Sequence, residues 1–160
     1  GCTGLKTGST SKAGFCVSAT ACRNGFSLIC VIMGAESRDV RNAAAVSLLD
    51  WGFANFGLFT APGGEGGSVP VTGGVKSSCS LRYETFTAVL PKAKLAGVEQ
   101  RIMKPEAVSA PVRAGDTVGS VGYALEGETI GQVALTAAED VAKIGFFDIL
   151  RRVLARFLLI

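Results

Sequence analysis

Two short apolar runs lie near the start of the chain and are separated by a turn signal. Residues 15–21 and 26–33 are rich in Val, Ile, Cys and Ala, and the Asn24-Gly25 pair between them is typical of a two-residue type I′ turn. The pattern predicts a β-hairpin over residues 14–34. Because both runs are almost continuously apolar, we expect both faces of this strand pair to be buried.

The predicted turn also indicates where the cysteines lie. If the strands join at residues 24 and 25, Cys22 faces Ser27 and Cys30 faces Ala19. No CxxC or other metal-ligand spacing is present. We interpret the five cysteines as small buried thiols, with a redox or metal role as the alternative. They are Cys2, Cys16, Cys22, Cys30 and Cys79.

The segment after the hairpin has helical periodicity. Residues 37–56 are predicted to form an α-helix, with Ser37 as its N-cap and Asp39 in the first turn, where a negative charge is favourable. The predicted apolar stripe consists of Val40, Ala44, Leu48 and Trp51.

Short strands dominate the next part of the chain. Residues 62–67 are rich in glycine and predict a linker or loop. Five candidate strands follow at regular spacing, which favours a small β-sandwich, and residues 126–128 read as a hairpin turn. The candidate strands are residues 69–72, 80–90, 98–103, 117–125 and 129–135.

Residues 144–160 form a predicted amphipathic helix. Its apolar face and basic face suit a helix that lies in a membrane interface, and packing on a protein core is the alternative. The apolar face consists of Phe146, Phe147, Ile149, Leu150, Val153, Leu154, Phe157, Leu158 and Ile160. The other face holds Asp148, Arg151, Arg152 and Arg156, with Leu159 as an exception.

Composition narrows the possible chemistry. The 160 residues carry a net charge of +3 and include no His, which excludes a Ser-His-Asp system and a Cys/His zinc finger on this chain. Residues 143–160 hold four basic groups and one acidic group, so the whole excess lies there. A neutral body argues against a nucleic-acid partner. The first residues do not have the pattern of a signal peptide, and the sequence has no apolar run long enough for a transmembrane helix. We interpret the chain as the C-terminal part of a longer protein.

One short motif carries candidate chemistry. Lys6-Thr7-Gly8 is followed by a further hydroxyl at Thr10. Gly8 would let a substrate backbone approach closely, and Lys6 and the two threonines offer a cation and hydroxyl donors that suit a carboxylate. Such groups on an edge strand predict binding of an extended peptide with a free carboxylate. The simpler interpretation is a solvated strand that begins with a lysine.

The longer string K-T-G-x-T-x-x-A-G, followed by a hairpin and a helix, resembles the serine D-alanyl-D-alanine carboxypeptidases, the low-molecular-mass penicillin-binding proteins. The resemblance covers essentially the whole chain. It implies an α/β plus all-β fold, with a partial β-lactamase/transpeptidase-like domain at 1–57, a small β-sandwich at 58–142 and an amphipathic membrane-anchor helix at 143–160. Further similar stretches are Ile32-Met33-Gly34, Arg41, Leu48-Leu49, Trp51-Gly52-Phe53, Ala110-Pro111-Val112 and Leu125-Glu126-Gly127.

The resemblance also implies roles for individual residues. The backbone N–H of Ser9 would form half of an oxyanion hole, and some family members have His at this position, which leaves a backbone role intact. Arg41 would assist carboxylate recognition, and a surface helix arginine is the alternative. The implied substrate-binding residues are Lys6, Thr7, Gly8, Thr10 and Arg41.

The nucleophile and base of the family are not found in this chain. The S-x-x-K and S-x-N motifs are expected upstream of Gly1, and the formal match at Ser9–Lys12 lies in the wrong place. The implied activity is removal of the terminal D-Ala from peptidoglycan stem peptides, with no metal or cofactor, and the fragment alone is expected to be inactive. Implied partners are the peptidoglycan pentapeptide, β-lactams, the upstream segment and, through residues 143–160, the membrane surface. The implied location is extracytoplasmic, peripheral to the outer face of the cell membrane.

Three other interpretations compete with this one. Class A β-lactamases also carry K-T-G, but the additional β segment and basic tail argue against them. Lys104 near Ala110-Pro111 is similar to a biotinyl or lipoyl carrier hairpin, but Pro105 follows the lysine directly. A non-catalytic, membrane-bound β module that positions cell-wall partners is the third alternative.

Overall fold

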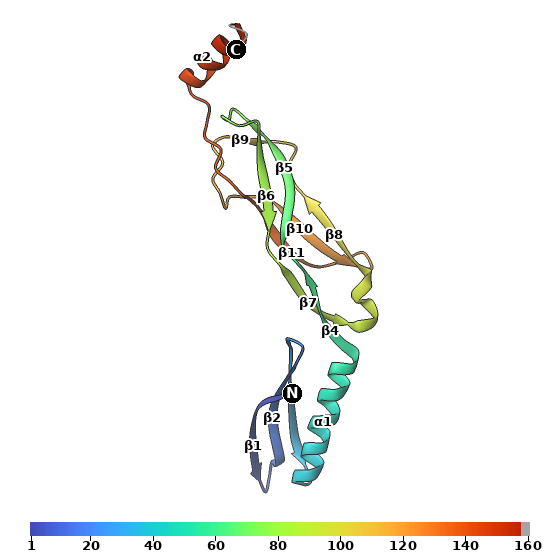
Figure 1. Ribbon diagram of the computed structural model, residues 1–160. Helices are drawn as coiled ribbons and strands as arrows, with labels where there is room; N and C mark the ends of the chain where they lie inside the picture. Colours follow the sequence, from blue (N-terminus) through green and yellow to red (C-terminus); the bar gives the residue numbers. More distant parts are fainter. Residues whose placement is uncertain (158–160) are drawn as a thin grey trace. The chain divides into compact units, whose positions relative to one another are not determined.

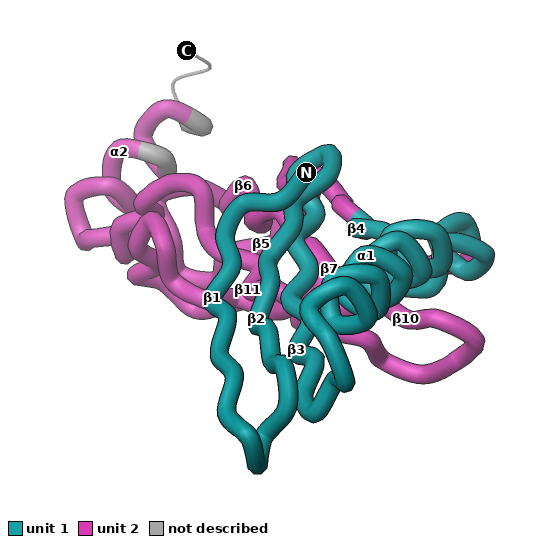
Figure 2. Tube along the Cα trace, turned by 90° about the horizontal axis from the view of Figure 1, so that it is seen from below, with its two compact units in different colours: residues 1–59, 89–96 teal, residues 60–88, 97–160 magenta. Residues whose placement is uncertain are grey.

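The computed structural model describes residues 1–157, apart from the side chains of Arg152, Arg156 and Phe157. The predicted positions of those three side chains, and of residues 158–160, on the helical wheel therefore lie outside the described residues. The chain divides into two compact units, coloured teal and magenta in Figure 2. Unit 1 consists of residues 1–59 and 89–96, and unit 2 of residues 60–88 and 97–160.

Unit 1 contains a three-stranded antiparallel sheet in the order β1-β2-β3 (Figure 1). The strands are β1 Cys2–Thr10, β2 Gly14–Arg23 and β3 Phe26–Ala35. The hairpin predicted over residues 14–34 is confirmed, since its turn residues have φ values of 51° and 77°, as a type I′ turn requires. The register is also confirmed: Cys22 pairs with Ser27, and Cys30 pairs with Ala19.

A single long helix, α1, packs on this sheet. It spans Arg38–Asn55, and Ser37 caps it because its hydroxyl accepts a hydrogen bond from the N–H of Val40 at 3.2 Å. The helix and its cap are as predicted. The apolar stripe, however, does not form the buried face.

The buried face of α1 is turned away from the predicted stripe. Val40, Leu48 and Trp51 are exposed, and the buried residues are Arg41, Ala45, Gly52 and Phe53. The reason is a close approach to the sheet: a Cβ at Gly52 would lie 2.6 Å from Cδ1 of Leu28 on β3. Small residues therefore decide which side of the helix meets the sheet.

The unit 1 sheet is covered on one face only. Towards α1 it contributes to two small clusters of buried residues, one around Val17 and Cys30 and one around Phe26 and Phe53. On the opposite face Ile29, Val31 and Met33 are exposed, with 76% of Met33 accessible. The expectation that both faces are buried is wrong for this chain, because the described residues supply cover for only one of them.

Unit 2 is built around a six-stranded sheet in the order β8-β10-β11-β6-β5-β9 (Figure 1). The pairs within it are antiparallel except β5–β9, which is parallel. Its strands are β5 Gly64–Thr72, β6 Ser78–Tyr83, β8 Val98–Met103, β9 Val108–Ser109, β10 Thr117–Leu125 and β11 Glu128–Ala137. A separate two-stranded sheet joins β4 Phe56–Ala61 and β7 Phe86–Pro91, strands that both have residues in each unit. The 3-10 helix η1 spans Lys92–Gly97 and belongs to unit 1 except for Gly97.

The strands at 98–103 and 117–125 have the predicted bounds, but the loop predicted over residues 62–67 is wrong. β5 begins at Gly64 and runs through most of that segment. The glycines permit close approach between strands: a Cβ at Gly63 would lie 2.7 Å from the carbonyl oxygen of Tyr83, and one at Gly66 would overlap Leu135. They serve packing rather than flexibility.

Unit 2 is mostly β, as predicted, and its core contains fully buried side chains. Phe86 stacks on Tyr123 with ring centroids 4.3 Å apart. The predicted turn after β10 is confirmed, since its two residues have φ values of 53° and 86°. The largest fully buried side chains are Tyr123, Leu81, Leu135, Val69, Val121, Val141 and Cys79.

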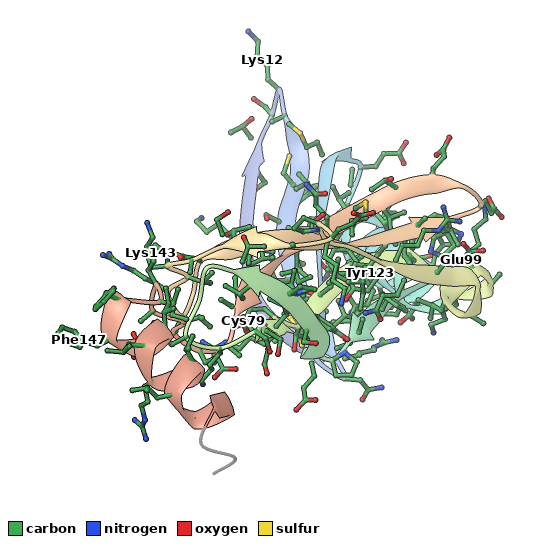
Figure 3. The ribbon with its side chains drawn as sticks, turned by 90° about the horizontal axis from the view of Figure 1, so that it is seen from above. Lys12, Cys79, Glu99, Tyr123, Lys143 and Phe147 are labelled. Carbon is green, nitrogen blue, oxygen red and sulfur yellow. The ribbon has the colours of Figure 1, made fainter. Side chains whose placement is uncertain are left out.

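The C-terminal helix α2 spans Phe146–Phe157. Its first turn is closed by Asp148, whose carboxylate accepts a hydrogen bond from the N–H of Gly145 at 2.9 Å. Phe146 and Phe147 are 73% and 81% exposed, and Figure 3 shows the Phe147 side chain pointing away from the helix. No helix among the described residues is long and apolar enough to cross a membrane.

Candidate functional site

The K-T-G segment lies on β1, an edge strand that is exposed along its whole length. Lys6 pairs with Ser18 of β2, and Ser18 pairs with Val31 of β3. Directly opposite residues project to the same side of a sheet, so Lys6 lies on the face that α1 leaves uncovered. Gly8, two residues on, belongs to the same face, and a Cβ added there would meet nothing within 4 Å.

The polar groups of this strand are held locally. The Lys6 ammonium donates a hydrogen bond to the carbonyl oxygen of Thr7 at 2.9 Å. The hydroxyl of Thr10 accepts one from the N–H of Ala13 at 2.9 Å, which leaves its own proton free to be donated. The second of these contacts holds the tip of the β1–β2 hairpin, and the outer edge of β1 pairs with no other strand of the described residues.

A cavity of about 660 Å³ surrounds this hairpin tip. Ser9 and Thr10 line it from β1, and Glu36 lines it from the segment before α1. Lys12 also lines it, and Figure 3 shows this side chain extending from the outermost point of the hairpin. Hydroxyls and one charge of each sign therefore lie next to the K-T-G segment.

Arg41 lies near the start of α1 and is 8% exposed, which makes it a buried arginine rather than a surface one. Its Nη1 donates to the carbonyl oxygen of Cys16 at 3.5 Å. Cys16 is the β2 partner of Gly8. The guanidinium therefore lies one strand away from the K-T-G segment, on the helix side of the sheet.

The structure thus brings five of the six predicted site residues together because they are consecutive on one strand, and it links Arg41 to them through β2. Sequence reasoning missed Asn42, whose side chain holds the guanidinium of Arg41. No sequence signal pointed to it, because adjacent residues on a helix do not ordinarily face each other.

The cysteines are only partly as expected. Among the described residues all five are free, and no group of three metal-ligating side chains occurs. Cys30 and Cys79 are buried, as predicted for small thiols, but Cys2 is exposed, and Cys16 and Cys22 are half-buried.

Two family models match the chain. Residues 60–143 match the one described as penicillin-binding protein 5, C-terminal domain, and residues 1–37 match the one described as D-alanyl-D-alanine carboxypeptidase. The chain belongs to the family of the penicillin-binding protein 5 C-terminal domain, whose model matches more than half of it. The residues that match the carboxypeptidase model include the whole of β1, β2 and β3.

Known D-alanyl-D-alanine carboxypeptidases resemble most of this chain. DacA of Haemophilus influenzae is 35% identical over 149 residues, which are 90% of this chain and 38% of that protein. DacF of Bacillus subtilis is 28% identical over 158 residues, which are 95% of this chain and 40% of that protein. The crystal structure of penicillin-binding protein 5 from Haemophilus influenzae has a TM-score of 0.71 and 34% identity, covering 86% of this chain and 42% of the other. The chain spans about two fifths of the length of the relatives it matches.

Proposed function

We propose that these residues form the C-terminal part of a serine D,D-carboxypeptidase that removes the terminal D-Ala from peptidoglycan stem peptides. The observation that carries the proposal is the K-T-G segment on an exposed edge strand, within the residues that match the carboxypeptidase model. An extended stem peptide can pair with the free edge of β1 through backbone hydrogen bonds. Lys6 supplies a cation for the peptide's terminal carboxylate.

Each site residue has one role in this proposal. Lys6 binds the substrate from the uncovered face of the sheet, and the open space above Gly8 admits its backbone. The hydroxyls of Thr7 and Thr10 donate hydrogen bonds to the carboxylate, and Arg41 assists in its recognition. The N–H of Ser9 provides half of the oxyanion hole.

The chemistry itself requires residues that this chain does not contain. In the proposed reaction a Ser of an upstream S-x-x-K motif attacks the carbonyl carbon of the penultimate D-Ala, and the peptide C–N bond breaks. The terminal D-Ala leaves with the proton, and water then hydrolyses the acyl-enzyme. β-Lactams acylate the same Ser, and the proposal needs no metal or cofactor.

The uncovered sheet face supports the presence of such an upstream segment. Ile29, Val31 and Met33 form an exposed apolar patch in the same sheet as Lys6, and apolar patches of this kind mark contact surfaces. Since the relatives are more than twice as long as this chain, the proposed occupant is the segment that carries the nucleophile. It would be brought next to Lys6 by the same contact.

We further propose that the functional divisions are a partial transpeptidase-like domain at 1–57, a β-sandwich domain at 58–142 and a membrane-anchor helix at 143–160. The exposed phenylalanines of α2 support the last of these, because aromatic rings enter the acyl boundary while Arg meets anionic headgroups. The protein would then lie outside the cytoplasm, peripheral to the outer face of the cell membrane.

The proposed activity is tested with a fluorescent penicillin. We expect a protein that carries both the upstream segment and these residues to become covalently labelled on a denaturing gel, and residues 1–160 alone to stay unlabelled. Substitution of Lys6 by Gln in the longer protein should abolish labelling, whereas Lys104→Gln, at an exposed lysine of unit 2, should not. A longer protein that stays unlabelled would instead favour the non-catalytic, membrane-bound β module.

The proposed anchor is tested with vesicles. We expect the chain to sediment with vesicles that contain anionic phospholipid and a Phe146→Ser/Phe147→Ser variant to stay in the supernatant. Leu58→Ser, which removes an exposed apolar group from unit 1, is the matched control. Equal sedimentation of the two variants would contradict a role of α2 in membrane binding.

A further inference from the structure

Arg41 is the one charged residue among those the structure describes that is buried. A buried guanidinium is expensive unless its charge and its N–H groups are satisfied. No carboxylate of the described residues pairs with it, and its three hydrogen bonds go to neutral oxygens. The positive charge of Arg41 is therefore left without a negative partner.

The hydrogen bonds of Arg41 use all three nitrogens of the guanidinium but not all of its N–H groups. Nε and Nη2 both donate to Oδ1 of Asn42, at 3.1 and 2.9 Å, and Nη1 donates to the carbonyl oxygen of Cys16 at 3.5 Å. A guanidinium has five N–H groups, so two remain, one on each terminal nitrogen, with no partner in the described part of the chain. A pair of N–H groups on the two terminal nitrogens is the arrangement that binds a carboxylate with two hydrogen bonds.

Asn42 is suited to hold the guanidinium without neutralising it. An amide oxygen accepts both N–H groups as a carboxylate would, but it carries no charge. An Asp at this position would form an ion pair and reduce the attraction for a second carboxylate. The neutral side chain thus fixes the direction of the guanidinium and leaves its charge available.

We propose that Asn42 is the positioning residue of Arg41, and that it orients the two free N–H groups towards the terminal carboxylate of the substrate. The inference rests on the proposed function. It predicts that Asn42 acts on substrate recognition through Arg41 and has no part in bond breaking, so KM should change while kcat is retained.

The test compares two acyl donors in the protein that carries the upstream segment. One is a peptide that ends in D-Ala-D-Ala with a free carboxylate, and the other is the same peptide with a C-terminal amide. For Asn42→Asp and Asn42→Leu we expect KM for the free carboxylate to rise on the order of tenfold, with kcat within about twofold and no change for the amide. Asn55→Asp places the same charge on the same helix away from Arg41 and is the matched control. Circular dichroism and the thermal midpoint establish that each variant is folded.

Arg41→Gln separates this inference from the proposed function. If Arg41→Gln removes the preference for the free carboxylate and both Asn42 variants reduce it, the inference is supported. If Arg41→Gln removes the preference but the Asn42 variants behave as the wild type, the role of Asn42 is overturned while the proposed function stands. If neither residue changes the preference, the proposed role of Arg41 fails together with that of Asn42.

Discussion

The two units of this chain are stabilised by different kinds of core. Unit 2 has seven fully buried large side chains, from Tyr123 to Cys79, drawn from four of its strands and from the segment after β11. Unit 1 has none in that class: its sheet buries mainly small residues such as Ala19 and Ala45, and exposes Ile29 and Met33 on its other face. The comparison shows that the number of strands does not determine how completely a unit buries its apolar side chains. Unit 2 buries its own apolar core, whereas unit 1 leaves one apolar face of its sheet exposed.

The largest expected difference between the units is in amide hydrogen exchange. In residues 1–160 alone, we expect β2 and β3 to exchange at least about 100-fold faster than β10 and β11, because local opening is cheap where few apolar contacts are buried. Mass spectrometry of exchanged peptides measures this. Joining the proposed upstream segment should slow exchange in β2 and β3 and leave exchange in β10 and β11 unchanged. If all four strands are equally protected in the isolated chain, and the monomer unfolds in one cooperative thermal transition, the two units do not differ in stability.

The core of unit 2 can be probed at two glycines of the same strand. A Cβ at Gly119 would overlap the carbonyl oxygen of Met103 in the backbone of β8, whereas one at Gly122 would lie 3.3 Å from the flexible end of the Met103 side chain. We expect Gly119→Ala to lower the free energy of unfolding of unit 2 by about 3 kcal/mol and Gly122→Ala by less than about 1 kcal/mol. Urea unfolding followed by tyrosine fluorescence measures both. Similar losses would mean that β8 moves freely past β10.

The start of α1 offers a smaller effect confined to unit 1. Ser37→Ala removes the hydroxyl that accepts from the N–H of Val40, and we expect unit 1 to lose about 1 kcal/mol. The control is Ser47→Ala, an exposed position in the middle of the same helix. Helical circular dichroism during thermal unfolding should show the difference, with the transition of unit 2 unaffected. A shift of both transitions would show that the units unfold together.

The smallest expected effect is a dependence on pH in unit 2. Lys76 donates a hydrogen bond to Glu139, which lowers the pKa of Glu139 below 4.5, and the same hydrogen bond raises the pKa of Lys76 above 10.5. The depressed pKa of Glu139 adds stability that is present above its usual value and is lost as pH falls through the folded pKa. The raised pKa of Lys76 adds stability that is lost only as pH rises through its own folded pKa.

Lys76→Met should therefore lower the thermal midpoint slightly between about pH 5 and 10 and have no effect in stronger acid. Because Lys76 is exposed and Glu139 is only partly buried, salt should weaken the effect. Differential scanning calorimetry across this pH range measures it, with Lys12→Met as the control. A difference between wild type and Lys76→Met that persists at pH 2 would contradict an ion-pair origin.

Local signals predicted the elements best. The Asn24-Gly25 turn identified the hairpin and its register, and Ser37 identified the start of α1, because both depend on residues close in sequence. The loop predicted at residues 62–67 is wrong, because the glycines of this segment pack closely against Tyr83 and Leu135, which are distant in sequence. A run of glycines has the same appearance whether it permits motion or close packing.

In the candidate site, too, local features were predicted from the sequence and contacts between distant residues were not. The residues from Lys6 to Thr10 were predicted together because a motif is local. The burial of Arg41 and its hydrogen bonds to Asn42 were not predicted, because they follow from the side on which α1 meets the sheet. The contact between Gly52 and Leu28 decides which face of α1 packs on the sheet, whereas the apolar stripe predicted a different face.

Each unit contains one tight two-residue hairpin, β2–β3 in the first and β10–β11 in the second, and this has a kinetic consequence. Hairpins of this kind close in about 1–10 μs, so each unit can begin folding around its own turn without waiting for the other. The pair of β6 and β11 joins Tyr83 to Leu135 across a far longer stretch of chain, and such non-local pairs form slowly. We therefore expect stopped-flow refolding to show two early, independent phases, with the pairing of β6 with β11 as the last step.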